Sequence, residues 1–600
     1  MGKFSKYLND LPDGKKKCII CSHEFNKQKD SSTNVFKYHF SHKHPKEWNK
    51  LTGNTEKLEE TDDPPMKRPF FQKTLEQSFS EYESDGVKSK RIERAVMQLI
   101  SSASLPLSIV DNVAWKNFTG IAIPRFKNKS RHYYQRTVLP EVYMEYKDKL
   151  FRELKNASNI SLSFDGWNDS SNKHQYLGVI VHFIEKDELT FRLLGTIDIS
   201  AERHTGEYIK RKITEILEEF EVSDKLVACV RDGASNVKLA AELLDRTHFD
   251  CMAHKLNLAV RDGIDTFQNA RSILDKFKKL CKIINKSGNL RREYEQISET
   301  FNIPALSLKK HIEVSFTVRW NTVHAVFERA LKVKEVIDYL SSEHADWPQL
   351  SGLEWSTVES TVAILQPIVD ATLLIQNRGM TSSAIIPLCT VLIGELNSNE
   401  KFQKFCQAIT GRLQSELAKY ENNEYLQFGT MVDVRFKGDY TNEEWKKKLL
   451  LKMYETQGSE VEDTDELSEV SGVKENAFSR FLKGADIKNM PKPATGSRRE
   501  AIHQEFLKWF EQKSDIDQNP IYFWNRAVNK GMFPTLHSVH KLYLCSPATT
   551  AEAERLFSSA RTILTDNRKI LSSENFSRLL FLQKNIRLMG FGCQNSRPDN

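Results

Sequence analysis

The stretch ISLSFDGW, residues 160–167, decides the fold because its apolar and polar side chains alternate without a break. Apolar residues stand at every second position from Ile160 to Phe164, and a period of two is typical of a β-strand. Working outward, the same reasoning predicts strands at YLGVIVHFIE (176–185) and LTFRLLGTIDIS (189–200). A helix at 204–220 and a short buried strand in KLVACVRDG (225–233) follow. The order β-β-β-α-β, then α, predicts an α/β domain built on one sheet.

The length of 600 residues exceeds what one compact core can hold and predicts about three or four domains. A hydrophobic content of 39% and nine Trp residues are enough to build real cores. Composition and periodicity change at several points along the chain. They divide it into a Lys-, Cys- and His-rich start at 1–50, a linker at 51–92, a helical unit at 93–150, the sheet domain at 151–264, a mainly helical region at 265–540 and a final amphipathic helical segment at 541–600.

Three carboxylates, far apart in the chain, stand where a metal ion could be held. Asp165 lies in SLSFDGW, Asp232 in ACVRDGASN and Glu554 in TTAEAERLFS. We expect both aspartates to end strands at one rim of the sheet and the glutamate to reach that rim on a helix. Two-metal phosphodiester cleavage needs such an acidic cradle, and Mg²⁺ prefers oxygen ligands. The sequence therefore predicts a site for Mg²⁺ or Mn²⁺.

Each carboxylate also has an ordinary structural interpretation. Asp-Gly is a turn signal at both aspartates, and Glu554 could pair with a nearby arginine on the surface. Glu552 fits a capping box with Thr549, so we expect it to fold back onto the start of its helix.

A compact zinc-ligand pattern precedes these motifs. Cys18, Cys21, His39 and His44 follow the spacing C-x2-C-x17-H-x4-H, in which the paired cysteines form a knuckle and the histidines project from one helix. A domain of about 40 residues has too little core to fold alone, so a bound Zn²⁺ would supply folding free energy. His42 is a competing ligand with a poorer spacing, and the alternative is a chance cluster of Cys and His.

Bulk properties limit the class of protein. The net charge of +7 is compatible with a nucleic-acid partner, although many other proteins carry as much. Two of the nine cysteines lie in the finger and the other seven are scattered singly, which indicates a reducing compartment rather than a disulfide framework. We find no run of 18 apolar residues and predict no membrane span. Basic clusters at 15–17 and 88–91 are compatible with a nuclear location, although such short runs are also common on solvated surfaces.

Together these motifs resemble a transposase of the hAT superfamily that carries an N-terminal BED zinc finger. The resemblance runs through nearly the whole chain. Besides the two aspartate motifs, it is carried by VFKYHFSHKHPKEW (35–48), ERHTGEYI (202–209), CMAHKLNL (251–258), SFTVRWNT (315–322) and SPATTAEAERLFSSARTILTDNRKILSSEN (546–575). The last of these is similar to the hAT dimerisation segment.

The resemblance implies a ribonuclease-H-like α/β catalytic domain that is interrupted by a large all-α insertion. An N-terminal BED finger and a helical DNA-binding and dimerisation region would accompany it. Asp165, Asp232 and Glu554 would be the catalytic triad. Arg319 and Trp320 would contact DNA, with the indole stacked on a flipped base. Cys251 and His254 would support the site.

The function that the resemblance implies is cut-and-paste DNA transposition by at least a homodimer. Such an enzyme binds double-stranded transposon ends, excises the element with hairpins on the flanking DNA, and joins the 3′-hydroxyl ends to target DNA. The first rival is a domesticated BED-finger regulator that binds DNA without cutting it. A second rival is a generic metal nuclease of the same fold, which the C-terminal motif disfavours.

Overall fold

The computed structural model describes residues 4–11, 14–26, 34–52, 80–83, 85–169, 174–304, 321–456, 498–564 and 571–591. The chain divides into two compact units, Met1–Leu75 and Glu76–Asn600. We describe each unit by itself. The predicted linker at 51–92 lies mostly outside the described residues, and its last six residues belong to a helix that begins at Val87.

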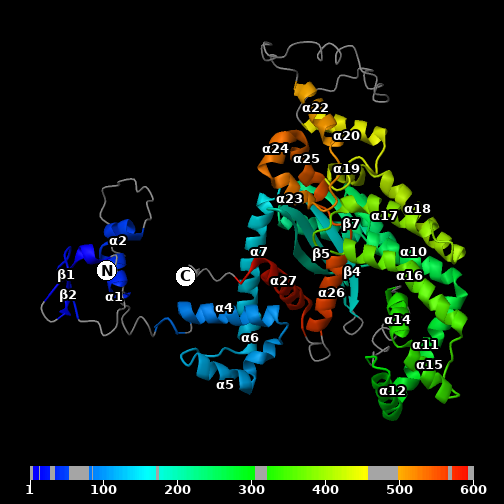
Figure 1. The fold of residues 1–600 in the computed structure, drawn as a ribbon, viewed down its shortest axis with the longest axis horizontal. Coiled ribbons are helices and arrows are strands. Elements are labelled where there is room, and N and C mark those ends of the chain that lie inside the picture. Colours follow the sequence, from blue (N-terminus) through cyan, green and yellow to red (C-terminus); the bar gives the residue numbers. More distant parts are fainter. Residues whose placement is uncertain are drawn as a thin grey trace. The chain divides into compact units, whose positions relative to one another are not determined.

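The small unit is a three-stranded antiparallel sheet with two helices (Figure 1). Its elements are β1 (Leu8–Asp10), β2 (Lys16–Cys18), β3 (Glu24–Phe25), α1 (Asn34–Lys43) and α2 (Pro45–Thr52). Its core consists of little more than Phe4, Phe25, Phe36 and Phe40 around Cys18. So few apolar side chains agree with a domain that depends on a metal ion for its stability.

The large unit is built on a mixed five-stranded sheet with the order β6-β5-β4-β7-β8. Its strands are β4 (Ile160–Asp169), β5 (His174–Glu185), β6 (Glu188–Asp198), β7 (Leu226–Arg231) and β8 (Thr247–Asp250). The first three strands pair antiparallel, whereas β7 pairs parallel to β4 and β8 pairs parallel to β7. The crossover from β6 to β7 runs through α8 (Gly206–Glu219), and α9 (Ser235–Leu243) follows β7.

The strands predicted from the sequence are therefore present in the predicted order. Side chains of β7 enter two different cores, Leu226 and Cys229 one and Ala228 and Val230 the other, so both faces of the strand are buried. This explains why its sequence does not alternate. The short strand β8 was not predicted, because THFD carries too few apolar residues to stand out.

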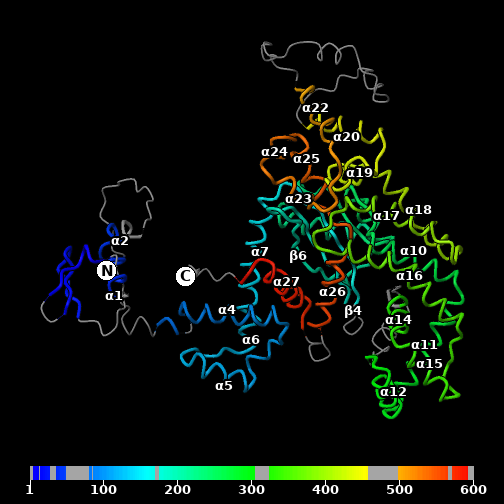
Figure 2. Tube along the Cα trace, viewed as in Figure 1, coloured from blue at the N-terminus to red at the C-terminus, as the bar shows by residue number. Residues whose placement is uncertain are grey.

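Helices from both ends of the chain pack with the sheet in one continuous core. These helices are α4 (Val87–Ser102), α7 (Leu139–Asn156), α26 (Ala551–Ile563) and α27 (Ser573–Met589). The C-terminal α27 contacts α4, α7 and β6, and Figure 2 shows the red helix beside the blue and cyan ones. Shorter elements complete this region: η3 (Leu107–Asp111), α5 (Val113–Ala122), α6 (Arg131–Tyr133) and the π-helical turn Tyr134–Val138.

Between β8 and α26 the regular elements of the described residues are helices. They are α10 (Met252–Thr266), α11 (Gln268–Lys286), α12 (Gly288–Thr300), α14 (Asn321–Lys332), α15 (Lys334–Glu343), α16 (Gly352–Ile375), α17 (Ile385–Asn397), α18 (Gln403–Glu421), α19 (Glu424–Val432), α20 (Glu443–Thr456), α22 (Arg498–Glu511), α23 (Pro520–Asn525), α24 (Ala527–Met532) and α25 (Pro534–Leu544). They form two further large cores and a small cluster of Met380, Ala384 and Phe436. One of the large cores includes Ala228 and Val230 of β7. The helical region is thus anchored directly on the sheet.

Helix α16 is long and apolar enough to cross a membrane by length and composition alone. Its residues Ile364, Leu365 and Ile368 lie in a core of this unit, and a buried core helix passes the same test. The helix therefore gives no positive reason to place the chain in a membrane.

Candidate functional site

Asp165 and Asp232 are neighbours because of the register between two parallel strands. Phe164 pairs with Arg231 as the last pair of the β4–β7 ladder, so the two aspartates are the next residues on the two strands. Asp165 does not end its strand as predicted, since β4 continues to Asp169 in its antiparallel pairing with β5. The parallel ladder ends before it, however, and this places both carboxylates at one rim of the sheet.

Local hydrogen bonds fix both aspartates. The Asp165 Oδ1 accepts a bond of 2.8 Å from the backbone N–H of Gly166. The Asp232 Oδ1 accepts one of 3.2 Å from the N–H of Ala234, in the turn that leads into α9. These are the turn contacts that the alternative interpretation expected of Asp-Gly pairs. They leave other lone pairs of each carboxylate available, because an ionised carboxylate has about four acceptor sites.

Glu554 reaches the same rim on α26, which lies against β4 and β5. A glycine allows this close approach: a Cβ atom at Gly178 would stand 2.7 Å from Cδ2 of Leu556 on α26. Gly178 pairs with Asp165 across the β4–β5 ladder. The helix that carries the glutamate is therefore seated on the strand pair at the position of the aspartate.

The segment before α26 is held by the start of α10. The Met252 N–H donates a bond of 3.2 Å to the carbonyl of Ala548. The Thr550 N–H lies 3.3 Å from the Cys251 thiol sulfur, which is buried. These contacts set where the helix begins and so determine where Glu554 lies.

The charges of Asp232 and Glu554 act on Asp165. The pKa of Asp165 rises from 3.8 to about 7, first because the side chain is largely surrounded by protein and then because Asp232 repels its charge. Glu554 adds to this repulsion, and the hydrogen bond from Gly166 opposes it. Like charges gathered without a cation are typical of a metal or catalytic site, although structural networks also shift pKa values.

A pocket of about 490 Å³ opens beside these residues. It is lined by Asp165, Trp167, Ala253, His254, Asn257, Thr372, Gln376, Ala551, Glu554, Arg555, Phe557, Ser558 and Arg561. The sequence analysis missed Asn257, Ser558 and Arg561. Helical spacing could have found them, because Asn257 stands three residues after His254, and Ser558 and Arg561 stand four and seven residues after Glu554.

His254 lines this pocket, and Cys251 lies buried behind it. The Nε2 atom of His254 would stand 3.6 Å from a Cβ atom at Gly233, the residue that follows Asp232. Burial raises the pKa of the Cys251 thiol, which keeps this side chain protonated and neutral. The two residues thus pack against the turn of the second aspartate and the start of the helix that carries the glutamate.

The predicted capping box at Glu552 is wrong. The N-cap residue Thr550 makes no side-chain cap, and Thr549 Oγ1 accepts a bond of 3.3 Å from the N–H of Ala551. Glu552 does not fold back onto the helix start and is instead a buried ion-pair partner. Its Oε1 accepts a bond of 3.0 Å from Nε of Arg378 and pairs with Arg555 one turn further along the helix. Tertiary charge partners outcompete the local motif because they satisfy the carboxylate more fully once it is buried.

The carboxylate set fits a hard divalent ion in its chemistry, because all its donors are oxygens. Within the described residues, however, only the finger forms a group of three or more side chains whose ligand atoms gather around one point. Asp165, Asp232 and Glu554 are not such a group. Ligands spread over two ions about 4 Å apart need not all meet at one point.

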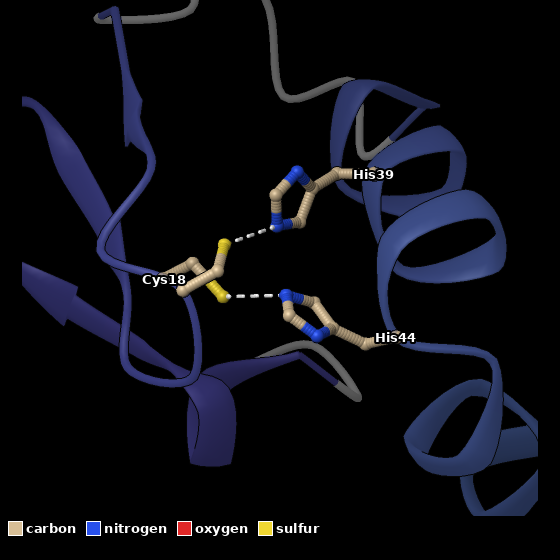
Figure 3. Close-up of side chains that lie close together, drawn as sticks. Cys18, His39 and His44 are labelled. Atoms are coloured by element: carbon tan, nitrogen blue, oxygen red, sulfur yellow. Dashed lines mark hydrogen bonds between the residues drawn. The ribbon is translucent and has the colours of Figure 1, made fainter. Parts of the chain in front are cut away.

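In the small unit, the ligand atoms of Cys18, Cys21, His39 and His44 all lie within 4.8 Å of one another. The Cys18 sulfur is 3.5 Å from Nε2 of His44 and the Cys21 sulfur is 3.3 Å from Nε2 of His39. The two histidines do not share one helix as predicted, because α1 ends at Lys43 and His44 lies between α1 and α2. Figure 3 shows the imidazoles of His39 and His44 pointing at two sulfur atoms, one of which is that of Cys18. Two sulfurs and two nitrogens in this arrangement fit tetrahedral Zn²⁺.

His42, Arg319 and Trp320 are the remaining residues that the sequence proposed as ligands or DNA contacts. His42 is exposed, stacks on Tyr38 and does not belong to the metal-ligand group. Arg319 and Trp320 lie outside the described residues.

Three segments match known protein families. Residues 163–256 match the ZBED1 RNase-like domain, residues 249–364 match the ZBED1 RNase-like helical domain, and residues 499–586 match the hAT family C-terminal dimerisation region. The matches cover the two aspartates, the start of the helical region and the helix that carries Glu554.

Curated proteins of two kinds are similar to this chain. Human zinc finger BED domain-containing protein 4 is 22% identical over 85% of this chain and 44% of its own length. The putative transcriptional regulator tpeD of Talaromyces stipitatus is 22% identical over 82% of this chain and 61% of its own length. The putative AC transposase of Zea mays is 25% identical over 58% of this chain and 44% of its own length. The chain thus spans between 44% and 61% of the length of these three relatives.

Proposed function

We propose that this chain, a relative of the hAT transposases and of BED zinc-finger proteins, is a metal-dependent DNA transposase that cuts transposon ends and joins them to target DNA. The observation that carries the proposal is that Asp165 and Glu554 line one pocket, while burial first, and then the charges of Asp232 and Glu554, raise the pKa of Asp165. In this proposal the mixed sheet is a ribonuclease-H-like catalytic domain, and residues 265–540 are an all-α insertion.

The chemistry follows from what each side chain offers. Asp165 and Asp232 would hold Mg²⁺ or Mn²⁺, and Glu554 would complete the cradle and orient the attacking oxygen. When bound, such ions activate a water or hydroxyl nucleophile and stabilise the leaving oxygen. Asp165 must lose its proton before it can serve as a ligand, and its raised pKa sets the pH at which this happens. His254 and Asn257 present further polar groups to the same pocket.

The other parts of the chain would deliver DNA to this pocket. The zinc finger at 1–50 would recognise the transposon end, and the helical unit at 93–150 would contribute to DNA binding and dimerisation. Arg319 and Trp320 would contact the flanking strand, with the indole stacked on a flipped base while the hairpin forms. A homodimer or larger assembly would form through the C-terminal segment at 541–600, and the protein would act in the nucleus.

A cleavage assay tests this function. Zinc-loaded protein is incubated with duplexes carrying the DNA that flanks its gene, in the presence of Mg²⁺ or Mn²⁺, and the products are separated on denaturing gels. We expect nicks and hairpins with the wild type and none with Asp232→Asn. Asp198→Asn, a matched change at the end of β6, should still cut. Wild-type activity in the Asp232→Asn variant would overturn the assignment of the site.

The second candidate is a domesticated DNA-binding regulator without cleavage activity. The similarity to human zinc finger BED domain-containing protein 4 and to a putative transcriptional regulator favours it. So does the failure of the three carboxylates to gather around one point. The same duplexes separate the two candidates, because a regulator binds a cognate end tightly and leaves it intact with either metal.

A further inference from the structure

Four cations from three separate elements gather at the C-terminal helices. Arg378 follows α16, Arg555 lies on α26, and Lys584 and Arg587 lie on α27. We call this group the cation cluster. Its one carboxylate, Glu552, pairs with Arg378 and Arg555. Within the described part of the chain, neither Lys584 nor Arg587 lies within ion-pair distance of a carboxylate, so the cluster carries three positive charges in excess.

Backbone carbonyls hold these cations where they are. The Lys584 ammonium donates a bond of 3.0 Å to the carbonyl of Arg555, and Arg587 donates to the carbonyl of Ser102 on α4. Arg378 also stands over the ring of Phe191, with its Cζ atom 5.0 Å from the ring centroid. The positions are therefore fixed before any ligand arrives, which reduces the ordering cost of binding.

The excess charge has an energetic consequence for the lysine. Burial lowers the pKa of Lys584 to about 8, and repulsion by Arg378, Arg587 and Arg555 adds to this effect against the attraction of Glu552. A site that crowds like charges and partly buries one of them is destabilised until an anion neutralises it.

The cluster adjoins the pocket that Asp165 and Glu554 line. Arg555 lines that pocket and donates a bond of 2.8 Å to the carbonyl of Gln376, which lines it too. The side chains of Arg378 and Arg555 remain 59% and 41% exposed, so a ligand in solution can reach them. A DNA strand that passes this pocket can thus place a backbone phosphate on the cluster.

We infer that Arg378, Arg555, Lys584 and Arg587 form a binding site for a backbone phosphate of the DNA strand that runs out of the acidic pocket. The inference rests on the proposed function for the identity of the ligand. Guanidinium groups bind phosphate in a bidentate manner, and two of them, Arg378 and Arg555, are held by the same carboxylate oxygen of Glu552. Because every nucleotide carries the same phosphate, such a site binds DNA regardless of sequence.

The salt dependence of DNA binding tests this site. Zinc-loaded full-length protein is titrated with a mixed-sequence duplex of about 30 base pairs at several salt concentrations, without Mg²⁺ or Mn²⁺. Each phosphate contact contributes about 0.9 to the slope of log K against log salt. We expect Lys584→Gln and Arg378→Gln each to reduce the slope by up to about that amount. Lys584→Arg should keep it.

A matched control is available elsewhere in the chain. Burial also lowers the pKa of Lys437 to about 8, but Asp439 and Asp515 face it instead of cations. Lys437→Gln should leave the slope unchanged. Circular dichroism of every variant confirms that it is folded. Wild-type slopes in Lys584→Gln, Arg378→Gln and Arg587→Gln alike would overturn the inference.

Two further measurements sharpen the assignment. DNA affinity of the wild type should fall as pH rises from 7 to 9, because the phosphate prefers the charged ammonium, and Lys584→Arg should remove this fall. Calorimetric titration with inorganic phosphate at constant ionic strength distinguishes a free anion from DNA. Phosphate binding that is lost in Lys584→Gln, with an unchanged DNA slope, would overturn the assignment to DNA. None of these readouts requires cleavage, so an inactive protein can still pass them.

Discussion

Binding of Mn²⁺ to the acidic pocket should release protons, and the average number released per site should depend on pH. Asp165 has a pKa of about 7 in the metal-free protein, because burial and the charges of Asp232 and Glu554 disfavour its ionised form. A metal ion binds only the ionised carboxylate. A group with this pKa is about 90% protonated at pH 6 and about 10% protonated at pH 8. We therefore expect about 0.9 protons to be released per occupied site at pH 6 and about 0.1 at pH 8.

Calorimetry measures this release directly. Zinc-loaded protein is titrated with Mn²⁺ in buffers of different protonation enthalpy, and the dependence of the heat on the buffer gives the number of protons. The same linkage predicts that the apparent Mn²⁺ affinity rises about tenfold between pH 6 and pH 8 and then levels off. Asp165→Asn should remove both the proton release and most of the affinity.

A second aspartate serves as the control. Asp198 ends β6, and burial acts to raise its pKa, but hydrogen bonds from Ser200 and Ser573 and the nearby His174 lower it overall. Asp198→Asn should therefore leave the proton release unchanged. The reasoning fails if the wild type releases fewer than about 0.3 protons at pH 6. It also fails if Asp165→Asn releases as many as the wild type.

Three further outcomes follow from the same structure. The folded chain holds a proton on Asp165 between about pH 4 and pH 7 that the unfolded chain lacks, so this residue lowers stability as pH rises through that window. Asp165→Asn should raise the free energy of unfolding by about 1–3 kcal/mol at pH 8 and leave it unchanged at pH 4, as chemical denaturation can measure. Gly178→Ala should lower the free energy of unfolding by about 1–3 kcal/mol, because the new methyl group pushes Leu556 and α26 away, and it should weaken Mn²⁺ binding. The double variant with Leu556→Ala should lose less stability than the sum of the two single variants. Cys18→Ser, or a zinc chelator, should make residues 1–75 the first target of limited proteolysis and leave the larger unit intact.

Local patterns in the sequence predicted the strands and the zinc ligands well. Alternation from Ile160 to Phe164 identified β4, and the spacing of Cys18 and His44 identified the finger, because both signals arise from a few neighbouring residues. The short strand β8 gave no such signal.

Tertiary packing decided what the sequence could not show. Glu552 matches a capping box, yet its partners Arg378 and Arg555 satisfy it instead. The close packing of α26 on the sheet depends on Gly178, because a side chain there would collide with Leu556. The sequence shows the glycine but not its contact with Leu556. The cation cluster likewise joins residues that only the folded chain brings together.

The docking of α26 on β4 has a consequence for synthesis of the protein. The strand with Asp165 leaves the ribosome long before the helix with Glu554, since almost four hundred residues separate them. A nascent chain can pair its strands early, but its acidic pocket stays incomplete until the final helices arrive. Any product that stops before residue 551 therefore carries the zinc-binding finger without a finished pocket. Such a fragment could still occupy DNA and so compete with the full-length protein.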